Sequence, residues 1–368
     1  MASDWVSEYF GSYRLKQGDY LIVRVLVTGN LGFVGAVVTR YLQDHGHRVV
    51  GLDTGFFSEC VALPPPKPDE QIIADVRDAQ SLPEVDAVVH LAALSNDPLG
   101  ELDEEITHSI NVKGSLNIAG LAKRRGIKRF VFASSCSMYG ISESGVADEE
   151  SQQNPQTAYA RSKVVAERGI LALASDGFAA CSLRFATAYG FSERPRLDIV
   201  VNNFIASAIA HGELILESDG TPWRPLVHVK DMARAILGVL EGNPSKSAGW
   251  AYNVGCGEEN YQVRNIAELV SSALGGLPCR IGTARGSDTR SYRVSFERFA
   301  DAYPEATPIE RLPAIVSQLA TDYSAVLTKE DFESIRFFRL RQINALLKAG
   351  QINSDLRWNN KFLREASS

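Results

Sequence analysis

Two residues that could carry out acid–base chemistry stand four positions apart in the segment 154–163, NPQTAYARSK. They are Tyr159 and Lys163, and on a helix this spacing places both side chains on one face. A nearby ammonium group stabilises phenolate over phenol, so it brings the pKa of a tyrosine down from about 10. Such a tyrosine can take a proton from a hydroxyl group or return one to a carbonyl. Asn154 as N-cap and Pro155 in the first turn predict the helix.

The segments around this pair alternate between two patterns. Short β-branched apolar runs predict strands, and the stretches between them have helical periodicity. The expected strands are Leu21–Val27, Arg48–Leu52, Gln71–Ala74, Asp86–Leu91, Arg129–Ala133, Ala180–Arg184 and Trp250–Val254, and the expected helices are Phe33–His45, Glu104–Arg125 and Gln156–Ala174. Nearly continuous apolar strands that alternate with helices are typical of a parallel sheet covered on both faces. The predicted fold class is therefore α/β, with a Rossmann-type doubly wound sheet.

The pattern loosens after residue 190, which predicts a division into two lobes. We expect an N-terminal extension at 1–20, a Rossmann domain at 21–190 to which 228–257 returns, and a smaller mixed substrate lobe at 191–227 and 258–368. The last clear helix is expected to begin at Thr328, with Asp331 completing a capping box. Its apolar residues predict a packing face: Phe332, Ile335, Leu340, Ile343, Leu346 and Leu347.

The composition excludes several classes of function. The chain has 368 residues and a formal net charge of −6, so it lacks the basic surface typical of proteins that bind nucleic acid or anionic membranes. Its five cysteines contain no C-x-x-C motif, which favours reduced thiols in the cytoplasm. Its six histidines form no metal-ligand pattern, no apolar run reaches the length of a membrane span, and Asp4 and Glu8 do not suit a signal peptide. We expect a cytoplasmic protein without a metal, and with neither nucleic acid nor membrane as partner.

A glycine-rich turn follows the first expected strand. Gly29, Gly32 and Gly35 are spaced three apart, so backbone amides can approach a pyrophosphate at the positive end of the next helix. Asp53 ends the second strand, 18 residues after Gly35, where a carboxylate accepts hydrogen bonds from the adenosine ribose. A carboxylate there repels a 2′-phosphate, and no Lys or Arg follows in 54–57. The pattern predicts NAD rather than NADP.

These motifs form a series that resembles the extended short-chain dehydrogenase/reductases, in the NAD-dependent epimerase/dehydratase family that includes UDP-galactose 4-epimerase-like enzymes. The resemblance covers roughly residues 21–300. Its landmarks are T-G-x-x-G-x-x-G at Thr28–Gly35, Asp53, Asp75-Val76, His90-Leu-Ala-Ala93, Asn111, Ser134-Ser135 with Tyr139-Gly140, and Tyr159 with Lys163. The resemblance implies an NAD enzyme of carbohydrate biosynthesis whose substrate is a nucleotide-diphosphate sugar.

The resemblance also implies contacts to the cofactor. Asp75 and Val76 would border the adenine, and Asn111 would support the active site from the long helix. The expected cofactor-binding residues are Gly29, Leu31, Gly32, Phe33, Val34, Gly35, Asp53, Asp75, Val76, Leu91, Ala92, Ala93, Asn111, Ser134, Tyr159, Lys163 and Phe185. His90 is more simply a strand residue with satisfied hydrogen bonds than a ligand.

For the catalytic centre, the resemblance implies a triad of Ser135, Tyr159 and Lys163. Ser135 would hydrogen-bond the sugar O4 and share the proton shift to Tyr159, and Lys163 would also bind the nicotinamide ribose. The expected substrate-binding residues are Ser135, Ser137, Thr187, Asn203, Arg224 and Arg285. Thr187 stands where the family's R-Y-F-N-x-Y-G segment usually has Asn. Arginine suits a diphosphate because its planar fork donates two hydrogen bonds at once.

The two residues after Ser135 discriminate among reactions. Related dehydratases carry Asp-Glu there, because elimination of water needs a further acid and base, and decarboxylating relatives tend to carry Glu. This chain has Cys136, expected to be a packed thiol, and Ser137. We therefore expect a 4-epimerase, in which Tyr159 removes the O4 proton, C4 gives its hydride to NAD, and the 4-keto sugar is then reduced on its other face.

Other functions use the same features. A nucleotide 4-keto-sugar reductase that consumes NAD(P)H would use these residues once, and a nucleotide-sugar dehydratase is a further alternative. A dinucleotide-binding regulator would not be an enzyme, and it would be expected to have lost Tyr159 or Lys163. Relatives often pair through the helices around 101–125 and 156–175, so we expect a homodimer.

Overall fold

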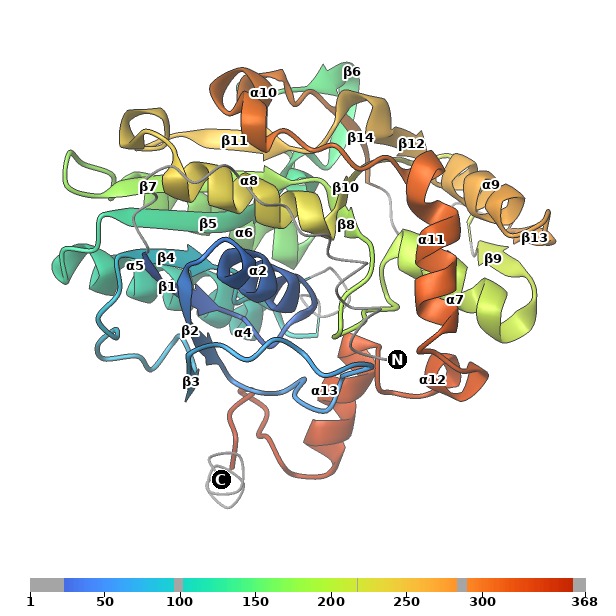
Figure 1. Cartoon of the computed structure of the whole chain (residues 1–368), viewed down its shortest axis with the longest axis horizontal. Coiled ribbons are helices and arrows are strands. Elements are labelled where there is room, and N and C mark those ends of the chain that lie inside the picture. Colours follow the sequence, from blue (N-terminus) through green and yellow to red (C-terminus); the bar gives the residue numbers. More distant parts are fainter. Residues whose placement is uncertain (1–22, 96–101, 217, 283–289, 360–368) are drawn as a thin grey trace.

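The largest element of the computed structural model, which describes residues 23–95, 102–216, 218–282 and 290–359, is a sheet of seven strands. These are β1 (Arg24–Thr28), β2 (Arg48–Asp53), β3 (Glu70–Ile73), β4 (Ala87–His90), β5 (Arg129–Ser135), β7 (Ala179–Phe185) and β11 (Ala251–Val254). All neighbouring pairs are parallel, in the order β11-β7-β5-β4-β1-β2-β3. The chain runs outward from β1 on one side and from β4 on the other, which leaves a crevice at their carboxyl ends. The predicted α/β fold class is confirmed (Figure 1).

Helices cover both faces of this sheet (Figure 1). Those that form the two layers are α2 (Phe33–Asp44) with α8 (Val229–Glu241), and α5 (Ser115–Arg124) with α6 (Ala158–Leu171). Successive residues of β1 alternate between the layers, because side chains of a strand point to opposite faces. Val25 and Val27 pack in the core that includes α2 and α8, and Leu26 packs in the core that includes α5 and α6. Burial on both faces explains why the strands are apolar throughout.

The helix expected over 104–125 is interrupted by a wider turn. It consists of α4 (Glu104–His108), a π-helical segment over Ser109–Gly114, and α5. Asn111 lies within the π-helical segment, and its carbonyl oxygen accepts a hydrogen bond from Ser115 Oγ at 2.6 Å. Such π-helical turns are rare and often occur at functional sites.

The start of α6 corrects the cap expected from the sequence. Thr157, not Asn154, is the N-cap, and its Oγ1 accepts a hydrogen bond from Ala160 N at 3.1 Å. Asn154 instead pairs through its backbone N–H with Met138 O at 2.9 Å. The helix therefore begins at Ala158, after Pro155 rather than with it.

The remaining strands form three small sheets beside the large one. β8 (Thr187–Tyr189), β10 (Trp223–His228) and β12 (Asn260–Gln262) form one, β9 (Leu214–Leu216) pairs with β13 (Cys279–Ile281), and β6 (Ile141–Ala147) pairs with β14 (Ser291–Val294). The helices in this part are α7 (Val200–His211), α9 (Val263–Ala273), α10 (Glu297–Ala302) and α11 (Leu312–Ser324). α7, α9 and α11 share a second core that includes Phe204, Ile266 and Leu319. β11 lies at the edge of the large sheet beside β7.

The C-terminal region contains two helices where the sequence predicts one. The capping box of Thr328 and Asp331 is confirmed, but α12 (Lys329–Glu333) ends after five residues and α13 begins at Arg339 and ends at Lys348. Ser334 Oγ donates to Asp331 O at 2.9 Å and accepts from Arg336 N at 3.1 Å. Such local bonds from a serine side chain compete with helical ones. α13 packs its apolar residues, among them Ile343, against Phe56.

The apolar residues expected to form a packing face in this region do not all do so. Most of the apolar residues expected to pack do so, whereas Ile335, between the two helices, is 48% exposed.

In the part of the chain that the structure describes, no helix combines the length and the apolar character that crossing a membrane requires.

Candidate active site

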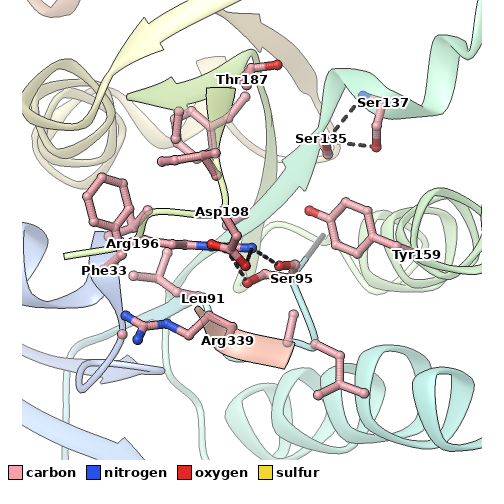
Figure 2. Close-up of a pocket in the computed structure, with 18 of the residues that line it drawn as sticks. Phe33, Leu91, Ser95, Ser135, Ser137, Tyr159, Thr187, Arg196, Asp198 and Arg339 are labelled. Atoms are coloured by element: carbon pink, nitrogen blue, oxygen red, sulfur yellow. Dashed lines mark hydrogen bonds and ion pairs between the residues drawn. The ribbon is translucent and has the colours of Figure 1, made fainter. Parts of the chain in front are cut away.

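A cavity of about 660 Å3 lies at the carboxyl ends of the strands of the large sheet. Most of the residues expected to bind cofactor or substrate line it: Gly29, Gly32, Phe33, Val34, Gly35, Asp53, Asp75, Val76, Leu91, Ala92, Ala93, Ser134, Ser135, Ser137, Tyr159, Lys163, Phe185, Thr187, Asn203 and Arg224. Figure 2 shows Ser135 at the end of β5 and Tyr159 on α6 at the same side of the cavity.

Two of the expected site residues that the structure describes do not line the cavity. Leu31 is not among the lining residues, and its backbone N–H donates to Asp53 Oδ2 at 3.1 Å. Asn111 stands behind the wall, where its side chain accepts from Leu94 N at 2.8 Å and donates to Ser162 Oγ at 3.0 Å. It thereby ties the cavity wall to the helix that carries Tyr159. Arg285 lies outside the described residues.

The glycine-rich turn forms a cradle in which side chains have no room. Gly29 adopts a φ of +76°, and a Cβ there would lie 2.8 Å from Ala92 N. A Cβ on Gly35 would lie 2.1 Å from Gly29 O. The first turn of α2 holds no acidic residue, and the positive end of a helix attracts an anion. The turn fits the diphosphate of a dinucleotide.

Asp53 presents a fixed carboxylate beside this cradle. Oδ1 accepts from Gly55 N at 2.8 Å, and Oδ2 accepts from Leu31 N. Burial raises the pKa of Asp53, and the two amides and the charges of Arg194 and Arg339 oppose that rise. A carboxylate held in this way can accept further hydrogen bonds from ribose hydroxyls.

Asp75 is part of a salt-bridge network at the edge of the cavity. Arg77 Nη2 lies 2.6 Å from Asp75 Oδ2, and Arg357 Nη1 lies 3.1 Å from the same oxygen. The Arg77 backbone N–H also donates to Asp75 Oδ1 at 2.8 Å. Asp75 therefore caps the turn after β3 as well as lining the cavity.

Tyr159 and Lys163 project from the same face of α6. Lys163 is only 3% exposed, and Nζ lies 5.8 Å from the centroid of the Tyr159 ring and 4.7 Å from that of Phe132. Nζ donates to Ala133 O at 2.7 Å. Burial lowers the pKa of Lys163 to about 7, although the charge of Glu167 opposes this. The ammonium is thus held beside the phenol by a strand carbonyl, with little water around it.

The serines at the end of β5 are arranged differently from one another. Ser135 Oγ donates to Ser137 Oγ at 2.9 Å and accepts from Ser137 N at 3.2 Å (Figure 2). Ser134 Oγ is buried and has no hydrogen-bond partner among the described residues. Both Ser134 and Ser135 line the cavity.

His90 and Cys136 are structural, as their sequence context indicates. His90 Nδ1 lies 2.7 Å from Thr28 Oγ1, and Nε2 lies 2.9 Å from Ser115 Oγ. Burial lowers the pKa of His90 to about 3. Cys136 is buried, its Sγ donates to Arg184 O at 3.1 Å, and burial raises its pKa.

Three further lining residues were expected to bind substrate: Thr187, Asn203 and Arg224. Arg224, on β10, donates through Nη1 to Trp223 O at 2.8 Å and to Arg290 O, and its guanidinium lies 5.8 Å from the centroid of the Tyr292 ring. Asn203 Nδ2 donates to Leu197 O at 2.9 Å. Thr187 begins β8.

The sequence did not single out a group of charged residues in the cavity wall. Arg196 pairs with Asp198, with Nε 2.7 Å from Oδ1, and donates through Nη1 to Ser95 Oγ at 2.9 Å (Figure 2). Arg196 and Asp198 both come from the loop 191–198. The arginines and prolines of this loop were the only feature of the sequence that could have indicated these two residues. Arg339 comes from α13, where nothing in the sequence distinguishes it from neighbouring arginines.

The family is established by comparison with known proteins. Residues 25–255 match the model of the NAD dependent epimerase/dehydratase family. The chain therefore belongs to this family, as the series of motifs predicts, and NAD is its cofactor. The glycine cradle and the Asp53 carboxylate fit this cofactor.

Individual relatives differ in their reactions. The chain is 29% identical over 298 residues to UDP-glucose 4-epimerase of Corynebacterium glutamicum, which covers 75% of this chain and 88% of that protein. It is also 29% identical over 260 residues to UDP-glucuronic acid decarboxylase 1 of Danio rerio, covering 68% of this chain and 60% of that protein. Among solved structures, MoeE5 in complex with UDP-glucuronic acid and NAD superposes with a TM-score of 0.71 at 26% identity, covering 83% of this chain and 100% of that one.

Proposed function

We propose that the protein is an NAD-dependent nucleotide-sugar 4-epimerase that acts in carbohydrate biosynthesis. The observation that carries this proposal is the pairing of Tyr159 with a buried Lys163 beside Ser135, in a cavity whose described acidic residues all have backbone amides or arginines as partners. Such a site can move one proton at a sugar hydroxyl, and bound NAD would supply the acceptor and donor of the hydride.

Each catalytic residue has a separate role in this proposal. Tyr159 takes the proton from O4 of the sugar and returns it after the 4-keto sugar has turned. Ser135 hydrogen-bonds O4, with its own position fixed by the Ser137 amide and hydroxyl. Lys163 places a cation beside the phenol and donates to the nicotinamide ribose. Because Ala133 O orients its ammonium, little rearrangement is needed on binding.

The acidic residues of the cavity support epimerisation over dehydration and decarboxylation. Among the described lining residues these are Asp53, Asp75 and Asp198. Asp53 accepts from two backbone amides, whereas Asp75 and Asp198 form ion pairs with arginines. None of the three adjoins Ser135 in the sequence, where elimination would need its further acid and base.

The nucleotide-diphosphate sugar is proposed to extend from this centre toward β8 and β10. Arg224 would bind the diphosphate, since it is buried and lines the cavity, and a planar guanidinium suits a diphosphate. Asn203 and Thr187 line the same region, and Ser137 lies beside Ser135. Arg285 remains a proposed contact on the strength of the sequence alone.

The test is turnover of substrate labelled with deuterium at C4, without added cofactor. The UDP-, dTDP-, GDP- and CDP-linked sugars are first screened by thermal shift. We expect the C4 epimer, unchanged in mass, with the label retained at C4 and with stoichiometric NAD in the purified protein. A product lighter by water or carbon dioxide would identify a dehydratase or decarboxylase, and a strict need for added NAD(P)H would identify a reductase; each would refute the proposal.

We also propose that the protein is a cytoplasmic homodimer. All five cysteines are free, which suits a reducing compartment. α4 and α6 contact each other and leave Val165 of α6 46% exposed, so an apolar residue is available for pairing through these helices.

A further inference from the structure

Arg339 places a buried cation in the cavity wall. It is the first residue of α13, is 3% exposed and lines the cavity. Nη2 donates to the backbone oxygens of Arg194 at 3.4 Å and Pro195 at 3.2 Å, and the guanidinium lies 4.7 Å from the centroid of the Phe57 ring. Nη1 is buried and has no hydrogen-bond partner among the described residues.

Within the described residues Arg339 forms no ion pair, although the carboxylates of Asp53 and Asp198 lie near enough to act on its charge. Arg196 already has Asp198 as its carboxylate, and Asp53 is bound by two backbone amides. Arg194 adds a further guanidinium that donates to Phe57 O at 3.0 Å. A buried charged group that lacks an ion-pair partner and leaves Nη1 without a hydrogen bond costs free energy, which favours the binding of an anion at this point.

The position of Arg339 indicates which anion it meets. Phe57, on which it stacks, follows Asp53 by four residues in the loop after β2. Figure 2 shows Arg339 on the side of the cavity where Phe33 begins α2, away from Thr187 and Ser137. This side holds the glycine cradle, so the nearest phosphates of the two bound molecules would be those of the cofactor.

We propose that Arg339 binds the diphosphate of NAD, so that α13 forms part of the cofactor site. The glycine cradle supplies backbone amides to one side of the diphosphate, and Arg339 supplies charge-assisted hydrogen bonds from the other. α13 lies beyond residues 25–255, which match the family model, so this contact belongs to the C-terminal segment of this chain. It depends on NAD binding and not on which sugar reaction follows.

The test compares Arg339→Gln with Arg341→Gln, which removes the same charge from an exposed position two residues further along α13. Affinities for NAD, adenosine and UDP are measured on protein freed of bound nucleotide. Since a hydrogen bond to a charged group contributes about 1.5–3 kcal/mol, we expect Arg339→Gln to weaken NAD binding about 10–100-fold. Arg339→Gln should bind adenosine and UDP with the affinities of the unaltered protein. Arg341→Gln should bind all three ligands with those affinities.

Three results would overturn the proposal. Unchanged NAD affinity would show that Arg339 does not contact the cofactor. An equal loss of affinity for adenosine would indicate a disturbed ribose site. A loss of affinity confined to UDP would assign Arg339 to the phosphates of the nucleotide sugar. Arg339→Met keeps the test available if Gln destabilises the fold, with the NAD-induced rise in Tm, relative to each protein's own ligand-free Tm, as the readout.

Discussion

Tyr159 has a hydroxyl that the proposed reaction uses twice, once as base and once as acid. Tyr159→Phe keeps the ring and removes only that group, so we expect turnover to fall by about 10²–10⁴-fold while NAD content and substrate affinity stay the same. The epimerisation rate and the NAD content of the purified variant check this. Tyr261→Phe, which alters a tyrosine bonded to Glu259 outside the cavity lining, is the control. Normal turnover in Tyr159→Phe would refute the assignment of Tyr159 as the proton carrier.

Lys163 should make the stability of the ligand-free protein depend on pH. Burial lowers the pKa of Lys163 from 10.5 to about 7. Between these two pH values the unfolded chain therefore holds a proton that the folded chain lacks. Stability therefore rises with pH through the window, and below it the buried ammonium imposes its full cost.

Lys163→Met removes this contribution. We expect the variant's stability relative to the unaltered protein to be more favourable at about pH 6 than at about pH 9, measured by urea unfolding. Lys113→Met, at an exposed position, should show the same difference at both pH values. A pH-independent difference for Lys163→Met would contradict the lowered pKa.

At the scale of elements, the turn between β1 and α2 sets the cofactor site. A Cβ at position 35 would overlap Gly29 O, so Gly35→Ala must displace the turn. We expect a loss of about 1–3 kcal/mol of stability together with loss of retained NAD. Thermal unfolding and the NAD content of the purified protein measure the two effects. Gly177→Ala, where an added Cβ meets nothing within 4 Å, should leave both unchanged, and retention of NAD by Gly35→Ala would argue against the cradle.

At the scale of the whole molecule, the proposed dimer depends on an exposed apolar residue. Val165→Glu places a charge on the outer face of α6, and burial of that charge at an interface would be unfavourable. We expect the variant to be a monomer that still folds, as measured by light scattering after size exclusion. Ile335→Glu changes a similarly exposed residue between α12 and α13 and should remain dimeric. An unaltered protein that is itself monomeric would refute this expectation.

The elements that the sequence predicted well are those whose pattern is local. The parallel strands could be predicted because burial on both faces requires continuous apolar residues. The glycine turn could be predicted because only glycine fits there. The start of α6 was mispredicted, because Asn154 and Thr157 are both suitable caps and only the pairing of Asn154 with Met138 decides between them.

The order of motifs by itself determined the family, the NAD cofactor and the placement of Tyr159, Lys163 and Ser135 as candidates, because helical spacing and strand ends fix where such side chains project. Only the tertiary structure decided what lies beside them. Arg339 reaches the cavity from a helix that begins 306 residues after Phe33 at the start of α2. The sequence around Arg339 resembles a surface helix, and its burial arises because the C-terminal segment packs against the loop that follows β2. Contacts between distant segments have no local signature, so the cavity wall could not be derived from spacing alone.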